Sequence, residues 1–568
     1  MERRCNSLYT SSRAKTQDRA IAAMMTLRVM FIALLAIVYI GVRDTNSAPQ
    51  QGYRMSQSIS LLATLGIAAG IFILVRSRLS KSKRGPPPPG PTPVPFFGNL
   101  FHIPKVLPWI AYRDWSLKYG DVIGLQLPGN RSLLILNSID AAKELLDKRA
   151  AMYSDRPKSL VVDLIGWSWN TPLIPYGEEW RRTRRASWQH FTPKVMIKHH
   201  PVLLQESRRF LRLLHAEPDR LQDLLEFSFA AVVLKIMYGI DIAPGDRNFV
   251  PLLREALEGP TQALPQGSFL VEHIPILRYV PSWVPGAGFQ KKFAHWRSLA
   301  SEVLEKPFAE AKRSWNKGEG HLSASHEMLE AISQRQLSFA EAADEERVAK
   351  IGAANVYAAG ADTTFATTLA FFMAMAMFPE VQAKAQAELD AVVGPDRLPE
   401  HSDREALPYV NAVVKEALRW FNVAPLGVVH RSREDDEYRG YFLPKGTLVL
   451  PNVWAMMHDP KVYPQPEVFE PERYLKDSVL NPDVPDPASV VFGFGRRICL
   501  GKNLADASLF INVASSLHVF KISVPLDEAG QPHQVKIDMS SGFLSHPSGF
   551  QCIIKPRSQA AEELILGS

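Results

Sequence analysis

The sequence has little cysteine. Only Cys5, Cys499 and Cys552 occur in 568 residues, and any pairing leaves one over. This number excludes a disulfide framework. It also excludes a Cys-rich zinc site and an all-cysteine iron–sulfur cluster, because each needs about four ligands. The composition is typical of a chain that faces the inside of a cell, and any cysteine chemistry must use a single thiol.

The chain also has little excess of one charge sign over the other. The chain carries 65 Lys and Arg against 58 Asp and Glu, a formal net charge of +7. This modest excess fits a weak preference for anionic membranes or an acidic partner. It argues against nucleic-acid binding, because that activity needs a concentrated basic face. Apolar residues make up 46% of the chain, which argues against wholesale disorder.

Long hydrophobic runs are confined to the N-terminus, which argues against a transporter with many spans. They cover 29–42 and 59–75, and a basic stretch at 76–84 follows the second. The second run is at the lower limit for a membrane span, and its basic flank is expected on the cytoplasmic side. Two interpretations of the first run stay open. It is one pass of a hairpin, or translation starts at Met55 and the run is a gene-model extension.

Proline supplies the next boundary. Five prolines fall within 86–91, which predicts a stiff polyproline II spacer. We therefore expect a membrane-anchoring region at 1–84, a proline-rich hinge at 85–95 and one catalytic domain at 96–568.

Most of the remaining sequence has helical periodicity. Two β-rich runs around Pro128-Gly129 predict a hairpin within 119–136. The polar stretch 333–346 is interpreted as a solvated loop that leads into the first turns of the longest helix. The expected fold class is mainly α with a minor β-sheet region. Helices are predicted at 140–148, 177–188, 342–377, 379–393, 409–420 and 500–520.

A glycine-rich loop ends in Cys499 and leads into a predicted helix. Backbone N–H groups and the positive helix end can there stabilise a thiolate. Gly495 and Gly501 would allow tight turns and the close approach of a flat cofactor. Phe492 can shield the sulfur, and Arg497 can pair with a carboxylate. The commoner fate of a lone cysteine is a small buried hydrophobic residue.

The segment resembles the haem-binding loop of the cytochrome P450 superfamily, Phe-x-x-Gly-x-Arg-x-Cys-x-Gly, at all five fixed positions. The resemblance implies the P450 fold, a helix-rich triangular prism around a buried haem. It also implies haem b as the cofactor, with the Cys499 thiolate as the axial iron ligand.

A second motif lies in a long predicted helix, at 359–364. Gly360 inside a helix costs about 1 kcal/mol relative to alanine and so needs a reason. Small residues at 358–361 would let a flat cofactor approach, which makes Gly360 a candidate cofactor-binding residue. Thr363 can bond the carbonyl of Ala359 and open a local groove. The segment resembles the family's oxygen-activation motif, which implies that Asp362 and Thr363 deliver protons to bound dioxygen. The alternative is a packing patch of small residues.

Glu416 and Arg419 share one helix face, as a surface ion pair would. They resemble the family's Glu-x-x-Arg helix, which implies a buried structural cluster completed by Arg473. Two further matches concern the haem propionates. Trp180 and Arg184 resemble the family's Trp-x-x-x-Arg helix, and together with Arg497 and His430 they would supply donors. Relatives often carry proline before that histidine, whereas this chain has Val429.

The resemblance is closest to fungal, basidiomycete-type microsomal members that tailor secondary metabolites. It implies a monooxygenase on the cytoplasmic face of the endoplasmic reticulum membrane, supplied by an NADPH-dependent flavin reductase, with cytochrome b5 as an optional second donor. The reductase would dock on Arg181, Arg182, Arg185, Arg496 and Lys502.

The substrate would be a lipophilic small molecule, a terpenoid or an aromatic compound. By position in the family pattern, the pocket would be lined from 160–170, 356–359, 423–429 and 542–545. Two alternatives stay open. One is a haem-thiolate isomerase, dehydratase or peroxide-using enzyme that needs no reductase. The other is an inactive membrane-anchored binding protein.

Overall fold

The computed structural model divides the chain into two units, Met1–Arg84 and Gly85–Ser568. It describes residues 85–95, 97–129, 131–265, 268–272, 274–319, 323–527, 530–531 and 538–568. The apolar runs at 29–42 and 59–75 lie outside the described residues. Within the described part, no single helix meets the length and apolarity of a membrane span. One pair bent by 104°, Phe339–Met377 with Pro379–Val392, meets them jointly.

Helices make up most of the second unit, which confirms the predicted mainly α fold class. In chain order they are α3 (Pro108–Tyr119), α4 (Ile139–Ala142), α5 (Ala150–Tyr153), α6 (Leu160–Leu164), α7 (Glu178–Trp188), α8 (Pro193–Met196), α9 (His200–Ala216), α10 (Leu221–Tyr238), α11 (Phe249–Ala263), α12 (Phe289–Lys317), α13 (Ala324–Ser333), α14 (Phe339–Met377), α15 (Pro379–Val392), α16 (Pro408–Trp420), α17 (Val453–Met457), α18 (Lys502–Val519) and α19 (Gln559–Gly567).

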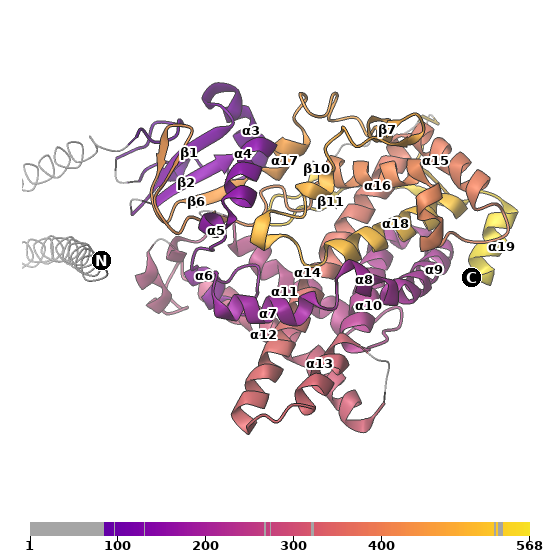
Figure 1. Ribbon diagram of the computed structural model, residues 1–568, viewed down its shortest axis with the longest axis horizontal. Helices are drawn as coiled ribbons and strands as arrows, with labels where there is room; N and C mark the ends of the chain where they lie inside the picture. Colours follow the sequence, from indigo (N-terminus) through magenta and orange to yellow (C-terminus); the bar gives the residue numbers. More distant parts are fainter. Residues whose placement is uncertain are drawn as a thin grey trace, which may run out of the picture. The chain divides into compact units, whose positions relative to one another are not determined.

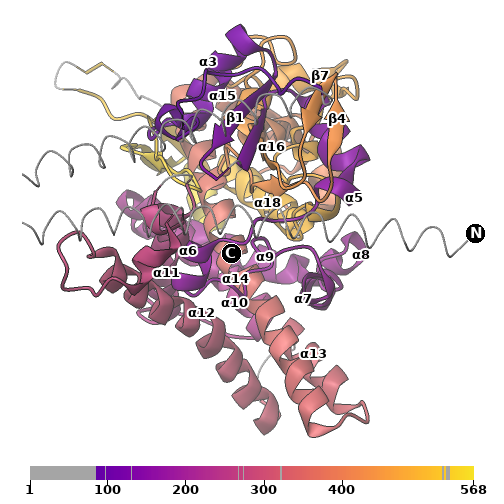
Figure 2. The ribbon, with the colours of Figure 1, turned by 90° about the vertical axis from the view of Figure 1, so that its left-hand side faces the viewer.

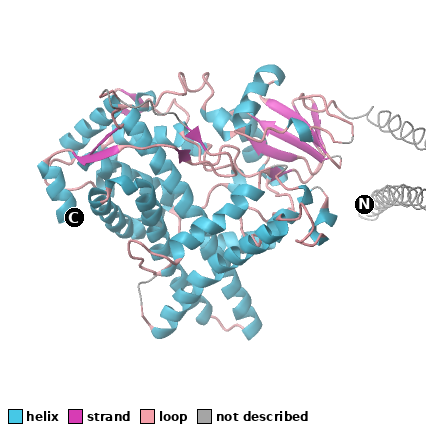
Figure 3. Ribbon diagram, turned by 180° about the vertical axis from the view of Figure 1, so that it is seen from behind, coloured by secondary structure: helices cyan, strands magenta, loops and turns pink. Residues whose placement is uncertain are grey.

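The strands are short and form small sheets, the largest at one end of the unit (Figure 3). That sheet has the order β1-β2-β6-β3, and β2 pairs antiparallel with β1 and parallel with β6. The hairpin predicted within 119–136 is β1 with β2. The strands are β1 (Val122–Leu127), β2 (Arg131–Leu136), β3 (His430–Arg431), β4 (Asp436–Tyr438), β5 (Tyr441–Leu443), β6 (Leu448–Pro451), β7 (Leu475–Lys476), β8 (Val479–Leu480), β9 (Phe520–Ser523), β10 (Asp538–Met539), β11 (Pro547–Ser548) and β12 (Ile553–Pro556).

Helix α14 runs through the middle of the unit (Figure 1). It packs against α7, α10, α13 and α18, and its residues from Phe365 to Ala376 are buried on every side. A helix that is apolar all round has to lie in a core, because no face of it suits water. Helices α12 and α13 lie side by side beyond this core (Figure 2).

Helix α14 begins earlier than its periodicity predicts. The stretch 333–346, expected as a loop, contains the first turns of the helix, which starts at Phe339. The Ser338 hydroxyl accepts from the Glu341 N–H, and the Glu341 carboxylate accepts from the Ser338 N–H at 2.8 Å. This capping box satisfies two backbone donors at the helix end and fixes the start. The prediction was wrong because it followed polarity alone.

The segment expected as a hinge, 85–95, belongs to the same compact unit as the rest of the domain. The Pro86 carbonyl accepts from the Phe442 N–H at 2.9 Å, and the Pro89 carbonyl accepts from the Gly124 N–H at 2.8 Å. Proline lacks a backbone donor but keeps its carbonyl, so a proline-rich segment can still dock beside strands. These contacts hold 85–95 against β1 and β5.

Candidate functional site

The loop before Cys499 is held by backbone contacts that need glycine. Gly495 has φ +53°, and a Cβ at this position would lie 2.3 Å from the Leu146 carbonyl oxygen. Its N–H donates to Asp147 Oδ1 at 2.5 Å, and the Cys499 N–H donates to the Phe492 carbonyl at 2.7 Å. Gly501 has an ordinary φ of −84°, so its backbone does not itself require glycine, and its role in cofactor approach stays a prediction. A Cβ there would lie 4.0 Å from the Cys499 sulfur.

The Cys499 thiol lies directly before the N-terminus of α18. Its side chain has accessible surface, although the surrounding protein desolvates it and so raises its pKa. Backbone N–H groups of Gly501 and Lys502 and the charge of Arg184 act in the opposite direction, because they stabilise the thiolate. A metal ion bound to the sulfur would add to these effects. The donor set therefore fits a thiolate ligand.

Three arginines gather beside this loop, and we call Arg156, Arg184 and Arg497 the arginine cluster. Arg156 and Arg497 are buried, with 4% and 9% exposure. Burial lowers the pKa of all three guanidinium groups, to about 10 for Arg497. Among the described residues, none of the three forms an ion pair with a carboxylate. The charge of Asp155 acts on Arg156 and Arg497 from beyond ion-pair distance.

The arginine cluster donates to backbone carbonyls. Arg497 donates to Ser154, Thr171 and Ile174 at 2.8, 3.2 and 3.0 Å, and Arg184 donates to Ile498 at 2.7 Å. Buried cations without a counter-ion are costly. An anionic ligand with two carboxylates beside a thiolate ligand would remove this cost, and haem has such carboxylates in its propionates. The residues present thus fit haem.

Trp180 lies beneath two members of the cluster. The guanidinium carbons of Arg497 and Arg184 are 4.6 and 5.6 Å from the centroid of its ring. The Tyr176 ring packs against it at a tilt, with the ring centroids 4.8 Å apart, and the Tyr176 hydroxyl accepts a hydrogen bond from Arg496 at 2.9 Å. The structure therefore brings Trp180, Arg184 and Arg497 together, as the family pattern implies. Their contact with propionates stays a prediction.

His430 lies in β3 and is fully enclosed. Its Nδ1 is 2.8 Å from the Tyr153 carbonyl, which can only accept, so Nδ1 carries the proton. Burial, followed by the charge of Arg156, holds the pKa of His430 well below its usual range. The neutral ring then has a bare Nε2, which accepts and does not donate. His430 can donate from Nε2 only after a nearby carboxylate has raised its pKa enough for Nε2 to be protonated as well.

The motif on α14 keeps its helical backbone. The Thr363 hydroxyl donates to the Ala359 carbonyl at 2.8 Å, as predicted, but the helix continues without a break. Gly360 is close to α10, because a Cβ at this position would lie 3.2 Å from Val233 Cγ2. This contact gives Gly360 a packing role, and its role in cofactor binding stays a prediction. Asp362 and Thr363 both keep partial exposure.

The charge cluster of α16 is buried. Glu416 and Arg419 have no accessible surface and share two hydrogen bonds of 2.8 Å. Arg473 donates to the same carboxylate at 3.2 Å. Arg419 also donates to the carbonyls of Met457 and Pro466. The structure brings the three residues together, away from the surface setting that would make the pair weak.

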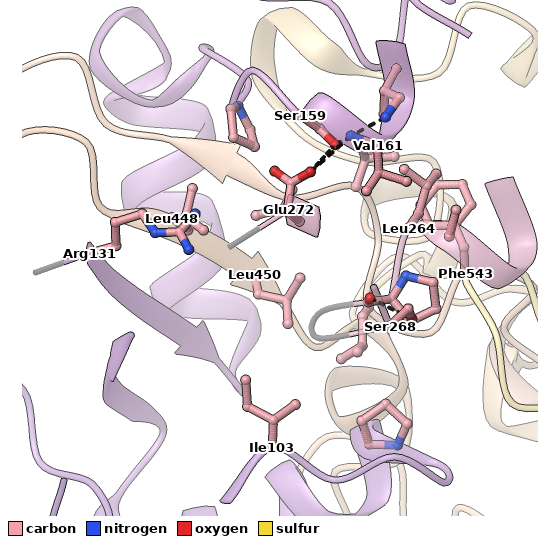
Figure 4. A pocket seen from close by; sticks show the side chains of 18 of the residues that line it. Ile103, Arg131, Ser159, Val161, Leu264, Ser268, Glu272, Leu448, Leu450 and Phe543 are labelled. Atoms are coloured by element: carbon pink, nitrogen blue, oxygen red, sulfur yellow. Dashed lines mark hydrogen bonds between the residues drawn. The ribbon is translucent and has the colours of Figure 1, made fainter. Parts of the chain in front are cut away.

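A pocket of about 1220 Å³ opens between the main sheet, α6 and the end of α11. Figure 4 shows Glu272 turned toward Ser159 and the Val161 backbone, to which it is hydrogen-bonded at 2.9 and 3.0 Å. Three of the four segments predicted to line a substrate pocket contribute to it. Val161, Val429 and Phe543 represent them, whereas 356–359 does not reach it.

Three residues of this region carry no sequence motif. Arg156 completes the arginine cluster, Tyr176 packs at a tilt against Trp180, and His546 forms an ion pair with Asp362 at 3.0 Å. The Asp-Arg-Pro triplet at 155–157 places an arginine beside proline, which is the only local signal for Arg156. No local signal points to His546, because 184 residues separate it from its partner.

Comparison with known proteins places these features in one family. The cytochrome P450 family model matches residues 88–554. The chain is 41% identical over 501 residues to cytochrome P450 monooxygenase COX2 of Coprinopsis cinerea, covering 88% of this chain and 94% of that protein. Cytochrome P450 monooxygenase 208 of Postia placenta is 41% identical over 507 residues, with coverages of 89% and 96%. Tryptamine 4-monooxygenase of Psilocybe cyanescens is 38% identical over 512 residues, with coverages of 90% and 100%. The chain therefore belongs to the cytochrome P450 family, as a monooxygenase of the basidiomycete type with haem b on a cysteine thiolate.

Proposed function

We propose that this monooxygenase inserts one oxygen atom of O2 into a neutral lipophilic molecule, a terpenoid or an aromatic compound. An NADPH-dependent flavin reductase supplies the two electrons, and the second oxygen atom leaves as water with two protons. Bound haem supplies the oxygen-activating chemistry. The observation that carries the substrate class is the pocket of about 1220 Å³.

The chain's own residues have separate tasks around that chemistry. Cys499 would hold the iron, and the arginine cluster with Trp180 would hold the propionates. Asp362 and Thr363 would relay protons on α14, where the Thr363 hydroxyl is oriented by the Ala359 carbonyl. The pocket orients the substrate and excludes water.

The pocket lining is mainly apolar, and its interior favours lipophilic ligands. Leu264, Leu450 and Phe543 are part of that lining (Figure 4). A pocket with many apolar side chains and few polar groups binds ligands mostly through burial of their surface. This composition supports a terpenoid or aromatic substrate.

Charge at the pocket restricts the substrate further. Lysine and arginine outnumber acids among the lining residues, where Glu272 is the one carboxylate. That carboxylate already accepts from Ser159 and from the Val161 backbone. A relative is named for a reaction on tryptamine, which is a cation at neutral pH. This pocket disfavours a cationic amine, so we expect a different substrate class. The cationic lining residues are Lys105, Arg131, Arg156, Lys158, Arg431 and Lys445.

A spin-state titration of the purified ferric protein tests the substrate class. We would use three ligand panels: sesquiterpenoids, polycyclic aromatics and tryptamine-like amines. The expected result is a low- to high-spin shift with one of the first two panels and none with the amines. Phe543→Ala should weaken the shift, whereas Phe339→Ala, at a residue 92% exposed on α14, should not. A shift confined to the amines would overturn the proposal.

The reductase is proposed to dock on the cysteine side of the domain. Arg181, Arg185 and Arg496 are exposed there, and none of them forms an ion pair among the described residues. Arg182, expected in the same patch, instead pairs with Asp344 at 2.7 Å and Glu345 at 3.3 Å. The patch is thus smaller than predicted. An acidic flavin domain would complement it.

Charge reversal tests this docking surface. Arg181→Glu with Arg185→Glu should raise the KM for the reductase and flatten its salt dependence, because long-range attraction is lost. The matched control is Lys291→Glu with Lys292→Glu, two exposed lysines on α12. An equal KM for the reductase and an equal salt dependence in both double variants would contradict the proposed docking surface. Substrate oxidation by hydrogen peroxide alone, at the reductase-supported rate, would instead favour the peroxide-using alternative.

We also propose that residues 1–84 anchor the enzyme to the endoplasmic reticulum membrane, with the domain on the cytoplasmic face. The apolar runs at 29–42 and 59–75 and the basic stretch 76–84 support this. Fractionation of fungal cells should recover the full chain in microsomes. A full chain found in the soluble fraction would contradict the anchor, and the mass of its N-terminal peptide would identify the start codon.

A further inference from the structure

His546 contacts the acidic residue of the α14 motif from the far end of the chain. Its Nε2 lies 3.0 Å from Oδ1 and 3.1 Å from Oδ2 of Asp362. Its ring is also 6.0 Å from the ring of Phe365, one turn further along the helix. The imidazole thus faces both carboxylate oxygens at once, which restricts the orientation of Asp362.

The backbone around His546 is fixed by its own loop. Its N–H donates to Ser540 Oγ at 2.9 Å, and its carbonyl accepts from the Ser540 N–H at 3.1 Å. Strands β10 and β11 pair on either side of this loop, with Asp538 opposite Ser548 and Met539 opposite Pro547. The histidine therefore approaches α14 from a closed two-stranded loop and not from a free chain end.

The charges that face His546 come from two helices. Asp362 lies on α14, and Glu226 lies on α10, where Arg254 of α11 holds it at 2.9 and 3.0 Å. Burial alone would lower the pKa of His546. The hydrogen bond and charge of Asp362 outweigh burial, and Glu226 adds to them, so the pKa of His546 is raised. The raised pKa favours the protonated ring, whose Nε2–H faces the Asp362 carboxylate.

We propose that His546 positions Asp362 and returns protons to it during turnover. The imidazolium gives its Nε2 proton to the Asp362 carboxylate, which passes that proton on toward Thr363 and so becomes a carboxylate again. The neutral imidazole then takes a proton from water. Side chains of both residues keep accessible surface, 27% for His546 and 19% for Asp362, so the pair can exchange protons with solvent. Two such transfers supply the two protons that one O2 consumes.

The first test measures the pair without turnover. Deuterium exchange at the histidine C2 position, followed by mass spectrometry across pH, reports the pKa of each histidine in the full chain. In Asp362→Asn the pKa of His546 should fall, because the imidazolium loses its hydrogen-bonded counter-charge and only the charge of Glu226 still opposes burial. His215, which pairs with Glu562 at 3.3 Å, is the matched control and should not change. An unchanged pKa of His546 in Asp362→Asn would show that the two side chains do not interact and would overturn the proposal.

The second test measures proton delivery. With reductase, NADPH and O2, the share of electrons recovered as hydrogen peroxide reports how often reduced dioxygen leaves with two protons before delivery through Asp362 has cleaved the O–O bond. This share should rise severalfold in His546→Gln at all pH values. In the wild type it should rise only as pH passes the pKa of His546. His546→Lys, which keeps a cation, should restore a low share, and His215→Gln should match the wild type.

The two readouts separate the roles of His546. If Asp362→Asn lowers the His546 pKa but His546→Gln leaves the peroxide share and its pH profile unchanged, the pair is structural only and the proposal is wrong. If the wild type has a normal carbon monoxide spectrum yet fails with every reductase offered, the reductase proposal fails. Even then, the deuterium-exchange measurement still shows whether His546 and Asp362 interact, because it needs no turnover.

Discussion

The guanidinium carbon of Arg497 lies 4.6 Å from the centroid of the Trp180 ring, and all three of its nitrogens donate to backbone carbonyls. Such a buried, stacked arginine is rigid and keeps its charge, although burial lowers its pKa to about 10. The arrangement prepares a binding site for an anion before the anion arrives, so little ordering remains to be done on binding.

Removal of this charge should therefore weaken haem retention more than folding. Arg497→Gln loses charge-assisted hydrogen bonds to a propionate, each contributing about 1.5–3 kcal/mol. We expect haem transfer to apomyoglobin to become about tenfold faster or more. The control is Arg313→Gln on α12, where the Arg313 side chain is 60% exposed. Equal transfer rates in both variants would contradict the propionate role of the arginine cluster.

The buried pair of Glu416 and Arg419 should be far more sensitive than a surface pair. Glu416→Gln leaves Arg419 enclosed without its counter-charge, which should cost about 3–5 kcal/mol of unfolding free energy. The exposed pair of Glu302 and Lys306 on α12 is the comparison, and Glu302→Gln should cost about 0–1 kcal/mol. Thermal unfolding and the yield of haem-loaded protein measure both. Similar losses in the two variants would mean that the α16 cluster does not support the core.

Alanine substitutions at two glycines distinguish the cost of a left-handed backbone from the cost of a steric clash. Gly245 has φ +80° with open space around a Cβ, whereas Gly495 has φ +53° with the Leu146 carbonyl 2.3 Å from that position. Gly245→Ala should cost about 1–2 kcal/mol from backbone strain alone. Gly495→Ala adds the clash, which displaces the loop that carries Cys499. We expect loss of the thiolate carbon monoxide band only in Gly495→Ala. A normal band there would show that Leu146 and its turn can move aside.

The parts of this site whose residues lie close together in the chain could be predicted from the sequence. Cys499, Arg497 and Gly495 lie within five residues, and Glu416 and Arg419 are one turn apart, so periodicity and motif were sufficient to group them. Arg156 and His546 could not be found in this way. Arg156 donates to the Val428 carbonyl, 272 residues distant, and the partner of His546 is 184 residues distant. Only the packed fold brings these groups together.

The errors in the sequence-based expectations also have physical causes. The start of α14 was placed too late because Ser338 and Glu341 were counted as polar loop residues, although their reciprocal hydrogen bonds stabilise a helix end. Arg182 was assigned to a docking surface on charge alone. Its two acidic partners, Asp344 and Glu345, are on another helix. Composition cannot show which charges neutralise each other.

A stacked pair of histidines should make the protein acid-sensitive. The rings of His200 and His401 are 3.9 Å apart and nearly parallel. Burial, followed by the charge of His200, lowers the pKa of His401 to about 4. In the unfolded chain the same group titrates near 6.5. Between these values the unfolded state binds more protons, so stability falls as pH decreases through this window and does not change above it.

Denaturant unfolding between pH 7 and pH 4.5 measures this effect. The His401 site should contribute a slope of up to about 1.4 kcal/mol per pH unit. His401→Phe removes the titrating group and keeps an aromatic ring beside His200, so the dependence on pH should become shallower while stability at pH 7 changes little. His295→Phe, on the exposed face of α12, should leave the slope as in the wild type. If the slopes of His401→Phe and the wild type coincide, another group controls acid unfolding. The two strongest candidates are then His430 and His458, because burial holds the pKa of each far below its usual value, to about 3 for His458.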